Sequence, residues 1–277
     1  MGMRISTNMA AITAQRQMTG SQREIQKSMA QLASGSRITK SADDAAGLAI
    51  SENLKSQIRS YSQANRNAND GISLIQTAEG GLGEISNILT RMRELGIQAS
   101  SDTVAEKERG MIDNEVQQLK QEAQRISVTT KFGSQSLIDG KGSTFDFQVG
   151  INNNAKEDRI SYDASLADAT ASSLGIDGFD FKSKGGAQEA LSQLDSAQSR
   201  VNGFRATLGA LQNRLQSTND NTSVMYENLS AANSRIRDTD VALASAEMTK
   251  NNILLQASTS TLAQANQIPG MALKLIG

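Results

Sequence analysis

Residues 187–236 read AQEALSQLDSAQSRVNGFRATLGALQNRLQSTNDNTSVMYENLSAANSRI and place an apolar or small residue at every third or fourth position. This alternation of three and four is the pattern of helices that pack lengthwise. As one helix, the segment would be roughly 75 Å long at 1.5 Å per residue. A stripe of that length needs partner helices of similar length to bury it. The pattern predicts a mainly α fold, a long antiparallel helical bundle or coiled coil, and a function that involves assembly.

A second long stripe runs from Leu48 to Leu95 and predicts a partner helix of about 55 residues. Three glycines lie inside it, Gly80, Gly81 and Gly83, and each costs up to about 1 kcal/mol relative to alanine. They indicate either close helix packing or a soft point that permits curvature, and the sequence leaves both open. The seam predicted between the two long helices consists of Leu54, Ile58, Ile72, Ile75, Leu89, Leu194, Phe204, Leu208, Leu211, Leu215 and Leu229.

Shorter elements are expected between the two long helices. Thr103 and Glu106 have the spacing of a capping box, ahead of a shorter helix that extends to about Val128. This helix would fold back beside the one before it. Further on, apolar residues alternate with polar ones around the turn Asn152–Asn154, which predicts one small β-hairpin region at about 140–165.

Both ends of the chain carry weaker amphipathic patterns, at 4–33 and after residue 240. Residues 34–44 break the first pattern, and we expect Ser41 or Asp43 to cap the helix that follows. Both terminal helices are poor in large apolar side chains, so we expect them to order when partners cover their stripes. This predicts discontinuous terminal helices at 1–42 and 241–277 and a middle helical-bundle domain at 43–240. The terminal residues expected to drive assembly are Ile5, Ile12, Ile25, Leu32, Ile253, Leu254, Leu262 and Leu273.

The composition argues against an enzyme. The chain contains neither His nor Cys, and therefore lacks the commonest general base, the commonest metal ligands and the thiol nucleophile. Its acidic residues have a simpler explanation as solvated helix surface. We therefore predict no catalytic residues, no metal and no cofactor.

Charge is unevenly distributed, because residues 1–42 carry six basic side chains and one acidic one. A basic arm can bind nucleic acid or anionic lipid. These basic residues are dispersed and lack interleaved aromatics, which favours a solvated helix face and predicts no nucleic-acid binding. The N-terminal residues lack the pattern of a cleavable secretory signal, and no run of 18 apolar residues predicts membrane insertion.

Five longer motifs are recognisable: ASGSRITKSADDAAGLAIS (33–51), RNANDGISLIQTAEGGLGEI (66–85), LTRMRELGIQAS (89–100), SRIRDTD (234–240) and QASTSTLAQANQIP (256–269). With these motifs the chain resembles the bacterial flagellins, over about residues 3–130 and 187–276. It departs from the family pattern at 130–140, and the variable outer region of many flagellins is nearly absent.

The resemblance implies a structural subunit that polymerises into the hollow, extracellular flagellar filament used for swimming. The implied partners are further copies of the chain, a flagellar export chaperone and the type III export apparatus, and the filament cap and hook-associated proteins. It also implies a host partner, the Toll-like receptor for flagellin, through Arg91, Leu95 and Glu115. The same surface should pack against neighbouring subunits.

Two alternatives remain open at this point. One is the hook-filament junction protein of the same family, which shares the two ends of the chain. The other is a coiled-coil adaptor that binds lipid or nucleic acid through the basic arm.

Overall fold

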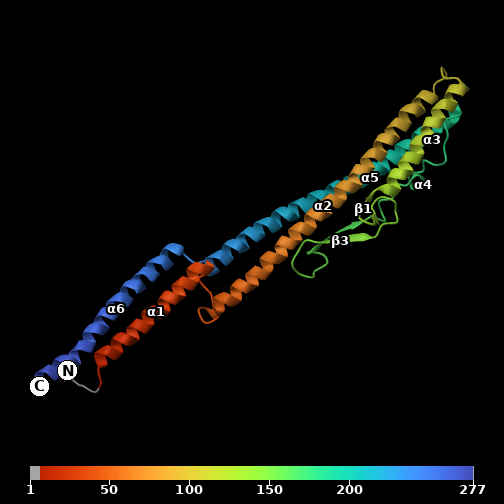
Figure 1. Ribbon diagram of the computed structural model, residues 1–277. Coiled ribbons are helices and arrows are strands. Elements are labelled where there is room, and N and C mark those ends of the chain that lie inside the picture. The colour runs from red at the N-terminus through yellow and green to blue at the C-terminus, as the bar shows by residue number, and fades with distance from the viewer. Residues whose placement is uncertain (1–6, 277) are drawn as a thin grey trace. The chain divides into compact units, whose positions relative to one another are not determined.

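The computed structural model describes residues 7–276, except for the side chains of 268, 269 and 271–276 (Figure 1). The described residues fall into two compact units, divided inside two long helices after Gln57 and after Glu227. The fold is mainly α, as predicted, and none of the described helices is both long and apolar enough to cross a bilayer. Its elements are α1 (Met9–Ser34), α2 (Ala45–Ala99), α3 (Glu106–Thr129), β1 (Lys131–Phe132), β2 (Gln135–Ser136), β3 (Thr144–Gln148), β4 (Arg159–Asp163), α4 (Ala171–Leu174), α5 (Lys184–Arg237) and α6 (Val241–Ile276).

In the first unit, which ends at Gln57 and resumes at Asn228, α1 and α6 lie side by side and antiparallel (Figure 1). The side-chain amide of Asn8 donates to the carbonyl of Ala265 at one end (2.7 Å), and the Thr239 N–H donates to the carbonyl of Gly35 at the other (3.0 Å). Asn8 also caps α1, because its side-chain oxygen accepts the N–H of Ala11. Both predicted terminal helices are therefore present.

Small residues line the contact between α1 and α6. On α1 the buried side chains recur every seventh position, and on α6 the buried ones are equally small. A seven-residue repeat is the spacing of helices that stay in contact along their length. Because the buried groups are small, the contact removes little apolar area from water. The buried residues are Ala14, Ser21 and Ser28 on α1, and Ala244, Ser258 and Ala265 on α6.

The turn between α1 and α2 ends in a cap that differs from the prediction. Asp44, not Ser41 or Asp43, caps α2, since its Oδ1 accepts the N–H of Gly47 at 2.8 Å. Asp43 instead closes the preceding turn, accepting the backbone N–H groups of Lys40 and Thr39 and the Thr39 hydroxyl. These hydrogen bonds, led by that of Lys40, hold the pKa of the Asp43 carboxyl below its ordinary value.

The second unit, Ile58–Glu227, packs parts of α2 and α5 against α3. Contacts between α2 and α5 show that the two run antiparallel: the Asn65 amide meets the Ser223 hydroxyl (3.2 Å), and Arg93 pairs with Asp195 (2.7 Å). The predicted seam follows this contact. Ile75, Leu89, Leu194, Leu208, Leu211 and Leu215 are buried in the core, Ile72 and Phe204 pack against it, and Ile58 is half-buried; Leu54 and Leu229, also half-buried, belong to the first unit.

Burial along α5 ends earlier than its sequence pattern. Thr222 is the last residue of the stripe that is buried, and Met225 is 46% exposed. Its neighbours Val224 and Tyr226 are exposed as well. Successive residues of a helix point about 100° apart, so one packing face cannot bury three adjacent apolar side chains.

The predicted β-hairpin is the antiparallel pair β3–β4, in which Phe145 lies opposite Tyr162 and Phe147 opposite Ile160. These four side chains pack on the helical core. A second, very short pair, β1–β2, was not predicted, because two-residue strands carry no measurable alternation. The predicted cap of α3 was wrong by two residues: the Ala105 N–H donates to Glu108, and Thr103 contacts Ser101 instead.

Candidate functional site

The first unit exposes large apolar side chains on both α1 and α6. Ile253 is 60% exposed, and Met9 is 61% exposed. Exposed large apolar side chains are candidates for contact with other proteins. The exposed large side chains are Met9, Ile12 and Met29 on α1 and Val241, Leu243, Ile253 and Leu254 on α6. We call these seven residues the terminal apolar set.

The residues predicted to drive terminal assembly divide into three groups. Ile12, Ile253 and Leu254 belong to the terminal apolar set. Ile25, Leu32 and Leu262 are half-buried. Ile5 lies outside the described residues, and Leu273 lies in α6 but its side chain is not described.

Two of the recognisable motifs, 33–51 and 234–240, meet in the first unit. The backbone N–H of Arg37 donates to the carbonyl of Arg237 (2.6 Å), and Ser36 pairs with Asp238 in an isolated β-bridge. Ile38 is buried beside Gly47, where a Cβ would collide with Ile38 and Asp44. The contacts of Ser36 and Arg37 tie the turn between α1 and α2 to the end of α5.

On the α2–α3 surface of the second unit, Arg91 and Glu115 form an exposed ion pair. The guanidinium donates from Nε and Nη2 to Glu115 (3.1 and 3.0 Å) and from Nη1 to Glu94 (3.1 Å). Hydrogen bonding to Glu115, and then to Glu94, raises the pKa of Arg91 above its ordinary value. The structure thus brings together two of the three residues expected at this surface.

Leu95 differs from the expectation that it shares this exposed face. Its side chain is 3% exposed and belongs to the hydrophobic core. Residues four apart in a helix are displaced by about 40° around the axis, which is enough to separate an exposed position from a buried one. Leu95 therefore packs in the core beneath the exposed pair of Arg91 and Glu115 and is not part of that surface.

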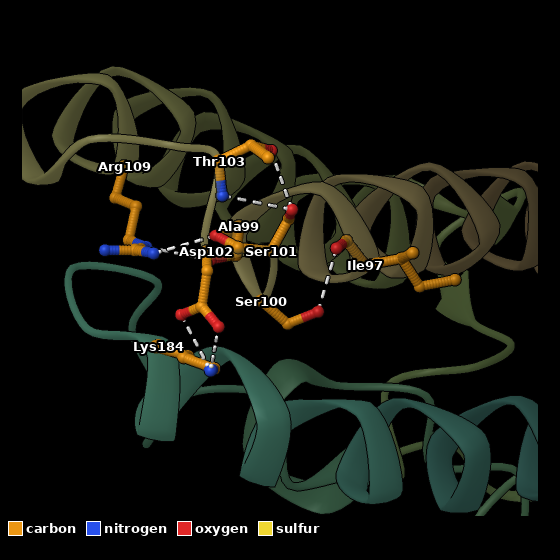
Figure 2. Close-up of polar contacts among 8 residues, drawn as sticks. All are labelled: Ile97, Ala99, Ser100, Ser101, Asp102, Thr103, Arg109 and Lys184. Atoms are coloured by element: carbon orange, nitrogen blue, oxygen red, sulfur yellow. Dashed lines mark hydrogen bonds and ion pairs between the residues drawn. The ribbon is translucent and has the colours of Figure 1, made fainter.

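The turn that joins α2 to α3 is held by two cations (Figure 2). Arg109 is buried and donates from Nε to the carbonyl of Ala99 and from Nη2 to that of Ser101, both at 2.8 Å. Lys184, at the start of α5, donates to both carboxylate oxygens of Asp102 (2.7 and 2.8 Å) and lowers the pKa of Asp102. Carbonyls at a helix C-terminus lack intrahelical partners, so Arg109 supplies the hydrogen-bond donors that satisfy the end of α2.

Two further charged residues of α3 hold the segment that precedes α5. Lys120 donates to the carbonyl oxygens of Phe179 and Asp177, and its Nζ lies 3.9 Å from the centre of the Phe179 ring. Burial lowers the pKa of Lys120. Asp113 accepts the backbone N–H of Phe181 at 3.0 Å. The sequence did not single out Arg109, Asp113 or Lys120; their only signal is a charged residue within the apolar spacing of α3.

The three glycines of α2 have different surroundings. At Gly81 a Cβ would lie 2.5 Å from the Thr130 hydroxyl and 3.1 Å from a methyl group of Ile138, so this glycine permits close packing. At Gly80 and Gly83 a Cβ would meet nothing within 4 Å. Of the two explanations left open by the sequence, close packing applies to Gly81 alone.

Among the described residues, no three acidic side chains gather closely enough to hold a metal ion. The charged groups that are buried each satisfy backbone carbonyls or N–H groups of a loop. The geometry is that of a scaffold with exposed contact surfaces.

Comparison with known proteins identifies the scaffold. Residues 5–143 match the family described as bacterial flagellin N-terminal helical region, and residues 191–276 match the bacterial flagellin C-terminal helical region. The flagellin of Halalkalibacterium halodurans is 45% identical over 98% of this chain and 99% of its own length. The flagellin of Bacillus subtilis is 40% identical over 99% of this chain and 100% of its own length.

A solved structure supports the fold as well. The crystal structure of Bacillus cereus flagellin is similar with a TM-score of 0.51 and 32% identity, over 61% of this chain and 94% of that one. The relatives are flagellins of comparable length, so the expectation of a short filament subunit is confirmed. The chain belongs to the bacterial flagellin family and is a structural subunit of the extracellular flagellar filament.

Proposed function

We propose that copies of this flagellin associate in the filament chiefly through the terminal apolar set on α1 and α6. The proposal rests on the different burial of small and large residues in these two helices. Alanine and serine fill the contact between α1 and α6, while isoleucine, leucine, valine and methionine side chains remain exposed. In a single copy, the large apolar side chains whose burial would stabilise these helices most therefore remain exposed to solvent.

The energetic scale supports association through this surface. Full burial of one large aliphatic side chain contributes about 1.5–3 kcal/mol. A filament repeats one heterologous contact along its length, so each copy needs two different complementary surfaces. The outward faces of α1 and α6 provide two such surfaces on one unit.

We further propose that the pair Arg91–Glu115 marks a contact surface of the middle unit, both for neighbouring subunits and for the host Toll-like receptor for flagellin. Its support is the exposed ion pair of the two side chains, 3.0 Å apart, which lies over the hydrophobic core of the second unit. The remaining partners proposed from the family are the export chaperone and export apparatus, and the cap and hook-associated proteins. We also propose that the chain has no enzymatic activity, in keeping with its lack of His and Cys.

Seeded polymerisation tests the role of the terminal apolar set. Sheared filaments are added to purified monomer, and the pelleted fraction is measured over a range of monomer concentrations. Ile253→Asp should raise the critical concentration by at least about tenfold, since it removes apolar burial and places a charge in the contact. Ile253→Leu, which keeps the apolar surface, should polymerise like the wild type.

Two deletions extend the test to whole helices. Removal of 1–42 or of 241–277 should leave a helical circular dichroism spectrum and abolish the pelleted polymer. Filaments formed by either truncated chain would refute the assignment of assembly to the terminal helices. A stable dimer that binds anionic vesicles or DNA and never pellets would instead favour the adaptor alternative.

A further inference from the structure

Methionine is concentrated in the first unit of the chain. Seven of the ten methionines belong to that unit, although it contains fewer than half of the residues. All nine aromatic residues belong to the second unit, and the chain has no Cys. Cysteine and methionine sulfur atoms are the side-chain groups that peroxides oxidise along a defined series of products. In the first unit, methionine is therefore the only side chain open to this chemistry.

Two methionines of α1 hold their side chains in solvent. Met9 is 61% exposed and Met29 is 56% exposed, and both belong to the terminal apolar set. Of the four methionines of the first unit whose side chains the structure describes, the other two, Met18 and Met248, are half-buried. Oxidation of methionine follows exposure of its sulfur. Met9 and Met29 are therefore the first of these four to react.

Both exposed methionines adjoin residues that join α1 to α6. Met9 follows Asn8, whose side-chain amide donates to the Ala265 carbonyl at 2.7 Å. Met29 follows Ser28, which is buried in the contact between the two helices. The two methionines are 20 positions apart, which is roughly 30 Å along the helix at 1.5 Å per residue. Their oxidation would therefore change the surface of the helix pair near both ends of α1.

A hydroperoxide converts a thioether into a sulfoxide. The sulfur attacks one peroxide oxygen, an S–O bond forms as the O–O bond breaks, and hydrogen peroxide is reduced to water. A polar S=O group then replaces a soft, apolar sulfur. Burial of a polar group without a hydrogen-bond partner costs free energy. The oxidised side chain is therefore a poor member of an apolar contact.

We propose that Met9 and Met29 are a reversible oxidation site that controls self-association of this chain. In a free subunit, a hydroperoxide converts both thioethers to sulfoxides and blocks association. In an assembled subunit, the contact shields them. A thiol-dependent methionine sulfoxide reductase reverses the change, as two thiols become a disulfide and the sulfoxide oxygen leaves as water. The inference rests on the terminal contact proposed above and adds the regulation of that surface.

Assembly of the oxidised monomer tests the effect. Purified monomer is treated with hydrogen peroxide until peptide masses show complete conversion at positions 9 and 29, and seeded polymerisation then gives the critical concentration. We expect a rise of at least about tenfold. Treatment with the two stereospecific sulfoxide reductases should reverse it. An unchanged critical concentration, or a collapse of the helical circular dichroism signal on oxidation, would overturn the inference.

Leucine variants assign the effect to the two side chains, because leucine has a similar apolar volume and is not oxidised. Met9→Leu/Met29→Leu should polymerise like the wild type both before and after peroxide. The matched control, Met111→Leu/Met225→Leu, removes two exposed methionines of the second unit and keeps those of α1. It should lose assembly on oxidation as the wild type does. The opposite result for either double variant would refute the assignment.

Oxidation rates in the filament test the shielding. Because reactivity follows exposure, sulfoxide formation at positions 9 and 29 should be at least about tenfold slower in seeded filaments than in monomers. Peptide masses at a series of times after addition of peroxide measure both rates. Equal rates in filament and monomer would contradict the proposal.

The two proposals fail in different ways. If Ile253→Asp blocks assembly and full oxidation of the wild type does not, the terminal contact stands and the oxidation site is refuted. If Ile253→Asp polymerises normally, and oxidation blocks the wild type but not Met9→Leu/Met29→Leu, the oxidation site stands and the contact on α6 is refuted. If neither change affects polymerisation, both proposals are wrong.

Discussion

The guanidinium of Arg37 donates two hydrogen bonds to the carbonyl oxygen of Ile236, 199 residues away in the sequence, from Nε at 3.2 Å and Nη2 at 2.6 Å. That carbonyl belongs to the last turn of α5, where helical carbonyls lack intrahelical partners and a cation is favoured by the helix dipole. The contact joins the turn after α1 to the end of α5 within the first unit.

Arg37→Ala should loosen this junction. The loss of a charge-assisted hydrogen bond at an exposed site is expected to cost about 1 kcal/mol. Amide hydrogen exchange at residues 35–44 and 236–240 should accelerate, while exchange in the second unit stays unchanged. Arg235→Ala is the control, since among the described residues no hydrogen bond or ion pair is found for that side chain. Equal protection of these amides from exchange in the Arg37 variant and the wild type would contradict a stabilising role for the Arg37–Ile236 contact.

Leu211→Asp should destabilise the second unit by several kcal/mol. Leu211 is 7% exposed in the core, and its replacement buries a carboxylate without a partner. Thermal unfolding followed by circular dichroism should show a clear fall in melting temperature. Ala206→Asp, on the exposed side of the same helix, should leave it nearly unchanged. An unchanged melting temperature of the Leu211→Asp variant would refute the proposed seam between α2 and α5.

Leu95→Ala and Arg91→Ala should separate a stability effect from a surface effect. Leu95 lies in the core, so truncation should cost about 2–5 kcal/mol. Arg91 is exposed, and its replacement should leave the melting temperature unchanged. Any loss of receptor binding or polymerisation in the Arg91 variant would then report the surface itself. A large fall in its melting temperature would show that the pair with Glu115 is structural.

Gly81→Ala and Gly80→Ala should act in opposite directions. A Cβ at Gly81 meets the Thr130 hydroxyl, which is already fixed by donation to the Ile126 carbonyl, so this variant should lose stability. A Cβ at Gly80 meets nothing, and alanine is the better helix former by about 0.5–1 kcal/mol, so this variant should gain it. Parallel chemical denaturation curves measure both. Similar shifts at the two positions would be inconsistent with these surroundings.

Tyr162 should titrate at unusually high pH. Burial, with a smaller contribution from the Asp163 charge, raises the pKa of Tyr162 to about 12, and its hydroxyl donates to the carbonyl of Leu137 (2.8 Å). In the unfolded chain a tyrosine ionises near pH 10. The neutral folded form is therefore favoured below about pH 10, and this stabilisation is lost as the pH rises from about 10 to 12. Phenolate absorbance should show a late step that Tyr162→Phe removes; an unchanged titration curve would contradict this.

The long helices could be predicted from the sequence because helical periodicity is local and accumulates along the chain. Over fifty residues the alternation of three and four at Ala187–Ile236 leaves no other period that fits. Two other local signals predicted α3 and the hairpin β3–β4, namely the spacing of a helix cap and the alternation of apolar and polar residues around a turn. The caps were predicted incorrectly, at Thr103 for α3 and at Ser41 or Asp43 for α2, because several neighbouring polar residues can accept the same N–H and only the backbone conformation selects one.

Other features depend on which faces meet. The sequence marks Ile12 and Ile253 as apolar residues of weak helices and does not single out Ala14, so it does not say that small residues fill the internal contact while the large ones face outward. The sequence placed Leu95 on one helix face with Arg91, but its burial depends on packing within the second unit, which four-residue spacing does not reveal.

By itself, the sequence determined a mainly helical chain with two long matched stripes, no His or Cys chemistry, and the motifs of a filament-forming family. Only the tertiary structure determined that Arg109 and Lys120 are buried and donate hydrogen bonds to backbone carbonyls outside α3. The physical reason is the range of the interactions. Helical periodicity is encoded within a few residues, whereas burial and charge pairing arise between residues that lie tens to hundreds of positions apart.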